Sequence, residues 1–125
     1  MNYWLIASGV ISVMALLGHH FAGGAQVLKP SMEELKTEML KVNMRFQFVF
    51  PTLIFATNAV VYFGAGVGKF SAETTIPLSS IYVLSGLALF WCGFSSTEKG
   101  AVMKVFPWIL FLVAGALGFV GVCGS

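Results

Sequence analysis

Four long runs of apolar residues alternate with short polar joints along this chain. The runs cover about residues 3–21, 46–64, 76–94 and 105–123 of 125. Each is close to the length of about 20 apolar residues that a helix needs to cross the hydrocarbon core of a bilayer. The runs are apolar on every side instead of alternating, which favours helices over barrel strands. The pattern predicts an all-α fold, an integral membrane four-helix transmembrane bundle with a single domain over residues 1–125.

The joint between the first two runs carries its own structural signals. Two adjacent glycines in Phe21–Ala25 predict a break in the first helix, because glycine is a poor helix former. Ser31 and Glu34 then match the S-x-x-E capping box of a helix start. Apolar residues follow at helical spacing opposite charged ones, so we expect a short amphipathic helix on the cytoplasmic surface over about 31–42. A helix continuing from there into the second run would be kinked at Pro51.

The charge pattern predicts an orientation. Only 10% of the residues are charged and 58% are hydrophobic, whereas soluble domains have about a quarter charged residues. A net charge of +2 is too small to suggest a nucleic acid partner. Basic residues gather in two joints, at Lys29, Lys36, Lys41, Arg45, Lys99 and Lys104. By the positive-inside rule, joints 22–45 and 95–104 face the cytoplasm and both termini lie outside, as in a bacterial inner membrane protein.

Small and polar residues at helical spacing predict where the helices pack together. On the first run Ser8 and Ser12 share a face, and Asn58 is the most deeply placed amide of the second run. An amide in lipid should find a partner on another helix. Small residues line the fourth run at Ala114, Gly115, Gly118 and Gly121, which predicts a packing surface inside the protein or between subunits. We expect Tyr62 to mark the outer membrane interface.

A second group of polar side chains would lie in the inner half of the bundle and forms the candidate ligand-binding set: His19, His20, Asn43, Arg45, Gln47 and Trp91. An ionisable group inside a membrane protein is a functional-site hypothesis by default. The alternative is that both histidines lie at the membrane interface, with their polar edges in headgroups or water. Adjacent histidines lack the i,i+4 spacing of a helical metal site, and both lie at one end of the bundle, which argues against haem. We therefore predict no metal site and no cofactor.

The second run begins with Asn43-Met44-Arg45-Phe46-Gln47, after a polar cytoplasmic joint. This layout of four spans with outer termini resembles the topology of the trimeric membrane-associated glutathione and eicosanoid enzymes, the MAPEG group. That resemblance implies glutathione as a ligand, held by Asn43 and Arg45. The family pattern N-x-x-E departs here, because Phe46 stands where the family has glutamate.

The runs contain no acidic residue, and the chain shows no nucleophile, base and acid at a spacing that would form a catalytic set. We therefore favour a non-catalytic accessory or self-associating subunit of a membrane complex, with the lipid bilayer and other membrane subunits, or itself, as partners. The alternative is a membrane-embedded enzyme or small-ligand binder with an inner-leaflet site. A third hypothesis is an oligomeric pore lined by serines and Asn58.

Overall fold

The computed structural model describes residues 1–97, 100–101 and 107–124, and within these ranges the regular structure is helical. The elements in chain order are α1 (Tyr3–Leu17), the π-helix η1 (Gly18–Leu28), α2 (Lys29–Glu34), α3 (Glu38–Gly66), the 3₁₀ helix η2 (Ala72–Thr75), α4 (Ile76–Ser95) and α6 (Pro107–Cys123). Part of the predicted joint 95–104, with Lys99 and Lys104, and the start of the predicted fourth run lie outside the described residues.

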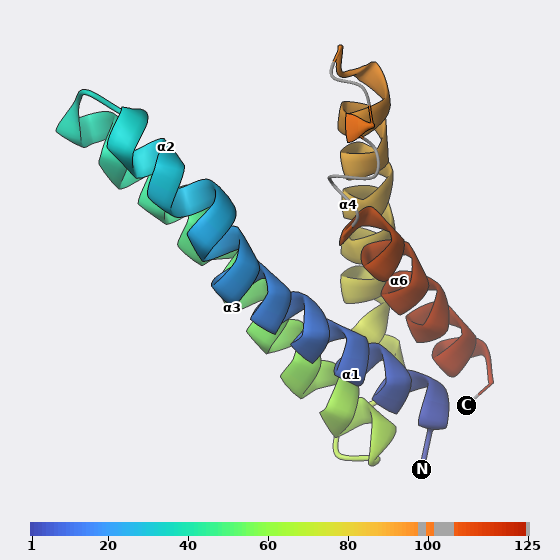
Figure 1. Ribbon diagram of the computed structural model, residues 1–125. Coiled ribbons are helices and arrows are strands. Elements are labelled where there is room, and N and C mark those ends of the chain that lie inside the picture. Colours follow the sequence, from blue (N-terminus) through green and yellow to red (C-terminus); the bar gives the residue numbers. More distant parts are fainter. Residues whose placement is uncertain (98–99, 102–106, 125) are drawn as a thin grey trace.

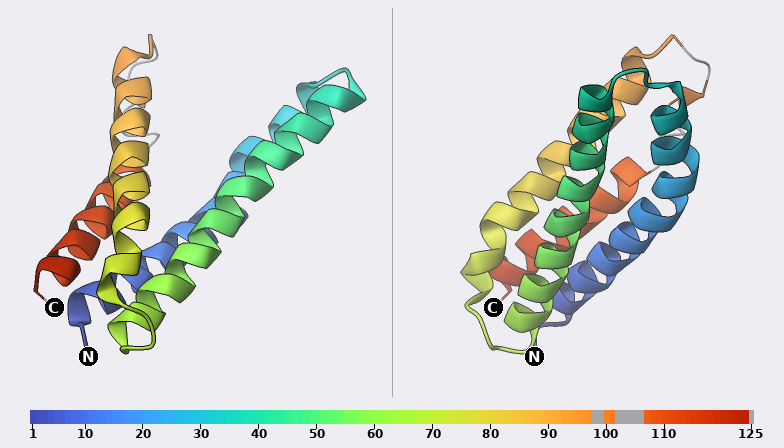
Figure 2. Two further views of the ribbon diagram at one scale, coloured as in Figure 1. Left: turned by 180° about the vertical axis from the view of Figure 1, so that it is seen from behind. Right: turned by 90° about the vertical axis from the view of Figure 1, so that its left-hand side faces the viewer.

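The helices form two antiparallel hairpins that diverge like the arms of a V (Figures 1 and 2). The first hairpin pairs α1, η1 and α2 with α3, and the second pairs α4 with α6. The hairpins meet where α1 packs against α6, beside the two chain termini and the joint between α3 and η2. We call this the closed end. The opposite end, with the turn at residues 35–37 and the end of α4, is the open end (Figure 1).

The predicted helix break at Phe21–Ala25 is wrong. One continuous helix of 32 residues runs from Tyr3 to Glu34, and its middle section is the π-helix η1. Each glycine costs about 1 kcal/mol of helix propensity, which tertiary packing routinely overrides. Here the ring of Phe48 lies against both glycines. A Cβ added at Gly23 would be 3.4 Å from that ring and one at Gly24 3.7 Å from it, so α3 packs closely on this part of η1.

The predicted amphipathic helix over 31–42 is also wrong. Ser31 and Glu34 lie in the last turns of the first long helix, and the Ser31 carbonyl accepts the backbone N–H of Leu35. The chain turns at 35–37, and α3 then runs without interruption from Glu38 to Gly66. Pro51 therefore lies inside α3, because one helix continues from residue 38 through the second apolar run.

Three of the helices are long and apolar enough to cross a membrane: Tyr3–Glu34, Glu38–Gly66 and Ala72–Ser95. The fourth predicted run corresponds to α6, which is apolar but shorter, with 17 residues described. The α-helical parts of the 32-residue helix, α1 and α2, are about 32 Å long at 1.5 Å per residue, and η1 adds to this, so the whole helix is longer than a ~30 Å hydrocarbon core.

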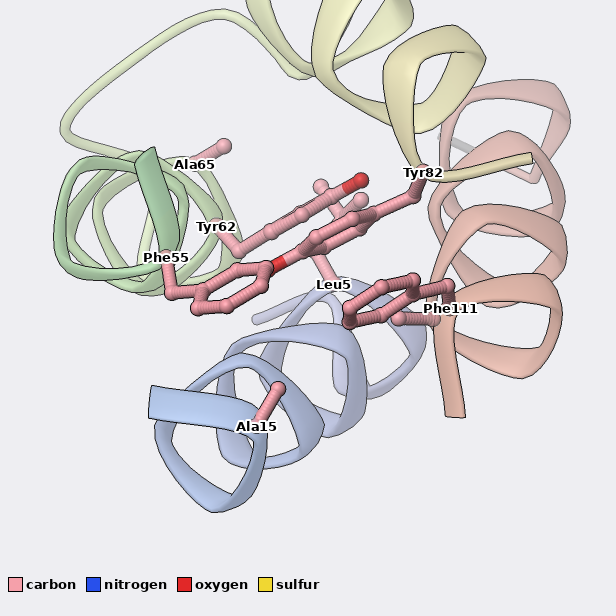
Figure 3. Packing of buried hydrophobic residues seen from close by; sticks show 8 residues of the cluster. Leu5, Ala15, Phe55, Tyr62, Ala65, Tyr82 and Phe111 are labelled. Carbon is pink, nitrogen blue, oxygen red and sulfur yellow. The ribbon is translucent and has the colours of Figure 1, made fainter. Parts of the chain in front are cut away.

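The core is a stack of aromatic rings between the two hairpins, close to the closed end (Figure 3). Tyr82 of α4 stacks on Phe111 of α6 and on Tyr62 of α3, with ring centroids 5.7 and 6.1 Å apart. Phe55 of α3 joins the stack at 5.2 Å from Phe111. Tyr62 is completely buried, so its predicted place at the outer interface is wrong. The sequence prediction treated this residue as an interface anchor, whereas its ring stacks on Tyr82 and its hydroxyl bonds to Ser79 in the core.

Candidate functional site

Hydroxyl groups of α1 and α4 and a backbone carbonyl of α6 form a chain of hydrogen bonds beside the aromatic stack. The Tyr82 hydroxyl donates to Ser12 Oγ at 2.8 Å, and Ser12 Oγ donates to the Ser8 carbonyl at 2.9 Å. Ser8 Oγ donates in turn to the Ala114 carbonyl at 3.0 Å. These bonds link α4 to α1 and α1 to α6, so the polar side chains join the two hairpins.

A second pair of hydroxyls joins α3 to α4. Tyr62 and Ser79 are hydrogen bonded at 2.8 Å, and both are completely buried. Asn58 is buried beside Tyr82, with 1% of its surface exposed. Within the described residues its Nδ2 finds no acceptor in full hydrogen-bonding geometry, and the Tyr82 side chain is its polar neighbour. The structure thus brings Asn58 to the other hairpin, as its depth in the second run suggested.

The small residues of α6 lie at its contacts with three other helices. Gly115 faces Val83 and the Ser79 carbonyl of α4, and Gly118 faces the hydroxyls of Ser79 and Tyr62. Gly121 faces Leu5 of α1, and Ala114 is 1% exposed. This surface is therefore occupied within the chain.

His19 lies in η1 and points at α3. Its Nε2 donates to the Phe48 carbonyl at 2.9 Å, and its ring stacks on that of Phe48 with centroids 4.3 Å apart. Thr52 Oγ1 donates to the same carbonyl at 3.1 Å. Pro51 has no N–H to offer the Gln47 carbonyl one turn earlier. Side-chain donors from His19 and Thr52 thus gather at the Phe48 carbonyl, one residue after the carbonyl that the proline leaves without its helical N–H donor.

His19 also borders a cavity between the hairpins, on the side facing the open end. Its volume is about 390 Å³, which is within the range of small-molecule pockets. The walls come from α1, η1, α3, α4 and α6 and are mostly apolar, with Phe55, Leu89 and Phe111 among them. His19 and Gln26 are the polar members of the lining. The cavity is partly open at its edge, where Gln26 and Val27 are exposed, and it offers a mostly apolar site to a ligand.

The other predicted ligand-binding residues do not gather around His19. His20 is exposed, with its ring against Phe21 at 5.3 Å, and Asn43 and Gln47 are exposed on α3. Trp91 is 66% exposed on α4, in the other hairpin. The structure therefore does not unite the six predicted residues in one site.

Arg45 borders a separate open groove between α2, the end of η1 and α3. Lys29, Lys41, Glu33 and Glu38 line the same groove, and Lys41 forms an ion pair with Glu38 at 3.0 Å. Positive and negative side chains are mixed there. Arg45 does not line the His19 cavity, so the two residues predicted to share an inner-leaflet site lie in different places.

Among the described residues, His, Cys, Asp and Glu side chains form no group of three that could hold a metal ion. Phe48 and Phe55, whose rings contact His19, and Phe111, which lines the same cavity, were not singled out from the sequence, where they look like any lipid-facing phenylalanine. Comparison with protein-family models, with curated proteins and with solved structures finds no match to this chain.

Proposed function

We propose that this chain is a multi-pass integral membrane protein. The observation that carries the proposal is the inverted distribution of polarity. Ser8, Ser12 and Ser79 are completely buried, whereas large apolar side chains such as Leu84 and Val60 are 65% and 64% exposed. A water-soluble protein buries its large apolar side chains first. Hydrocarbon around the helices reverses that preference, because polar groups must then find partners inside the protein.

We further propose that the closed end faces outward and the open end faces the cytoplasm. Lys29, Lys36, Lys41 and Arg45 all lie in the open-end part of the first hairpin, and the joint at the closed end carries Lys69. This asymmetry follows the positive-inside rule and supports a position in a bacterial inner membrane. Membrane location is tested by alkaline extraction of isolated membranes. The protein should stay in the pellet, and release into the supernatant would contradict the proposal.

Within the membrane, we propose a non-catalytic role as a self-associating or accessory subunit. The support comes from the open end, where the two hairpins diverge and α3 and α4 each keep large exposed side chains, including Phe46, Leu53, Trp91 and Phe94. Helices of another subunit would pack against these faces. The small-residue surface of α6 is already occupied within the chain, so it does not serve this contact.

The two free, exposed cysteines provide a direct test of self-association. Cys92 lies near the open end of α4, and Cys123 lies at the closed end of α6. The Cys123→Ser variant, which keeps Cys92, should form a disulfide-linked dimer when membranes are oxidised, and Cys92→Ser should not. A 13.4 kDa single chain in both variants, with no larger complex in mild detergent, would contradict the proposal.

A second candidate function is a membrane-embedded small-ligand binder, and the cavity beside His19 favours it. The glutathione form of this alternative, implied by the resemblance to the MAPEG group, has less support. It relies on Asn43 and Arg45, which lie outside that cavity. A pore is also less supported, because Ser8, Ser12 and Ser79 are buried and hydrogen bonded inside one chain.

A further inference from the structure

The cavity beside His19 has a defined hydrogen-bonding requirement, which comes from the way the imidazole is held. A carbonyl oxygen accepts hydrogen bonds and cannot donate one. Because Nε2 lies 2.9 Å from the Phe48 carbonyl, the Nε2 atom carries the proton. In the neutral imidazole the other nitrogen, Nδ1, is then an acceptor.

Gly23 lines the cavity together with His19. A Cβ added at Gly23 would lie 3.7 Å from His19 Nδ1 and 3.4 Å from the Phe48 ring, so Nδ1 faces Gly23. None of the described residues forms a hydrogen bond to Nδ1. Because Gly23 has no side chain, a ligand in the cavity can approach this acceptor. The ligand has to bring the hydrogen, since His19 offers none on that side.

The remaining walls describe the rest of the ligand. Phe55 meets the His19 ring edge-on at 5.6 Å and contacts Phe111 at 5.2 Å, so aromatic rings surround the polar corner. Aromatic rings favour edge-to-face and offset contacts with another ring. Further from His19 the lining is aliphatic, with Met14, Leu89 and Leu110. An aromatic hydroxyl next to an apolar tail matches all three parts of the cavity.

We propose that this cavity binds a phenolic amphiphile, a molecule with an aromatic hydroxyl that donates to Nδ1 of His19 and an apolar tail that extends between the hairpins. The proposal deepens the small-ligand alternative above, and it is tested separately from membrane location and self-association. Binding is measured on the purified full chain, so it can fail while the protein still fractionates with membranes.

The test compares 4-nonylphenol with its methyl ether, which has the same ring and tail but no donor. The measurement uses full-length protein in lipid nanodiscs. Empty nanodiscs give the partitioning into lipid, which is subtracted. The phenol should bind about three- to tenfold more tightly than the ether, the effect of one hydrogen bond. It should also shift the ¹⁵N resonance of His19 Nδ1.

The variants locate the effect. His19→Phe keeps a ring against Phe48 and removes the acceptor, so phenol and ether should bind it equally. Because this change also removes the bond to the Phe48 carbonyl, Gly23→Ala provides a second route. It adds one methyl group beside Nδ1 in ordinary contact. Phenol binding should fall about threefold or more in Gly23→Ala and stay unchanged in Gly24→Ala, whose added Cβ would meet only Phe48.

Three results would overturn the proposal. One is equal binding of phenol and ether to the unaltered protein. Another is a loss of affinity in His19→Phe that is the same for both ligands. The third is binding of 1-dodecanol as tight as that of the phenol, which would show that the aromatic walls contribute no selectivity.

Discussion

At the scale of single residues, buried hydroxyls hold the two hairpins together. The hydrogen bond from the Tyr82 hydroxyl to Ser12 Oγ joins the two hairpins, and Ser12 is completely buried. Removing it with Tyr82→Phe should lower the free energy of unfolding by about 0.5–1.5 kcal/mol, since the ring stack is kept and one hydrogen bond is lost. Thermal unfolding in mild detergent measures the change.

A double-mutant cycle with Ser12→Ala assigns that loss to the pair. Bonds of this kind between membrane helices average about 0.6 kcal/mol in such cycles. Tyr3→Phe is the control, because the Tyr3 side chain is 71% exposed. Strictly additive effects of Tyr82→Phe and Ser12→Ala would mean that the hydroxyls contribute separately, contrary to the geometry.

The close approach of α6 to its neighbours also depends on one residue. A Cβ at Gly118 would collide with Ser79 Oγ and lie 2.8 Å from the Tyr62 hydroxyl. Gly118→Ala should therefore destabilise the protein by about 1–3 kcal/mol through overpacking, despite the better helix propensity of alanine. Gly18→Ala is the matched control, because nothing lies within 4 Å of its added Cβ. Unfolding of Gly118→Ala at or above the temperature of the unaltered protein would contradict this contact.

At the scale of elements, α3 begins at Glu38, and not at the capping box that the sequence suggested at Ser31 and Glu34. Thr37 is the N-cap residue, and its side chain makes no capping hydrogen bond. Thr37→Asn should raise stability by about 0.5–1 kcal/mol, because asparagine is a stronger N-cap than threonine. Ser31→Ala should be nearly neutral, because Ser31 lies within a helix. A loss of about 1 kcal/mol in Ser31→Ala, measured by thermal unfolding, would instead support a capping box there.

The sequence predicted the helices but not all of their ends. The apolar runs identified α1, α3, α4 and α6, because the hydrophobicity of about 20 consecutive residues is a much stronger signal than that of any single residue. The break at Gly23 and Gly24 and the start at Ser31 were inferred from local propensities. Each is worth only about 1 kcal/mol, and the packing of Phe48 on η1 outweighs it. The spacing of Ser8, Ser12 and the α6 glycines suggested helix contacts, but no local signal named their partners.

The candidate site was less accessible from the sequence. His19 stood out as an ionisable residue in an apolar run. Its cavity, however, lies between two diverging hairpins, and the angle between the hairpins depends on how distant parts of the chain pack together. Leu89 and Leu110 line the cavity with side chains that resemble lipid-facing ones. Arg45 and Trp91 were grouped with His19 because they share a level in the bundle, whereas the structure places them on different surfaces.

At the scale of the whole molecule, the two ends differ in both charge and packing. Lys36 lies in the turn at the open end, and Lys69 lies in the joint at the closed end, next to both termini (Figure 1). If the hairpins cross a membrane, these two positions must face opposite sides. The proposed orientation, with the open end in the cytoplasm, relies on the positive-inside rule, because most of the described basic residues lie in the open-end part of the first hairpin.

Labelling of engineered cysteines tests this arrangement. Cys92 and Cys123 are first replaced by serine, and Lys36→Cys and Lys69→Cys are then made one at a time. A membrane-impermeant maleimide added to intact spheroplasts should label the Lys69→Cys protein only, and inside-out vesicles should give the reverse. Detergent should expose both positions, which shows that each thiol is reactive. Labelling of both from one side would mean that the long helices do not cross the membrane, and the reverse pattern would mean that the closed end faces the cytoplasm.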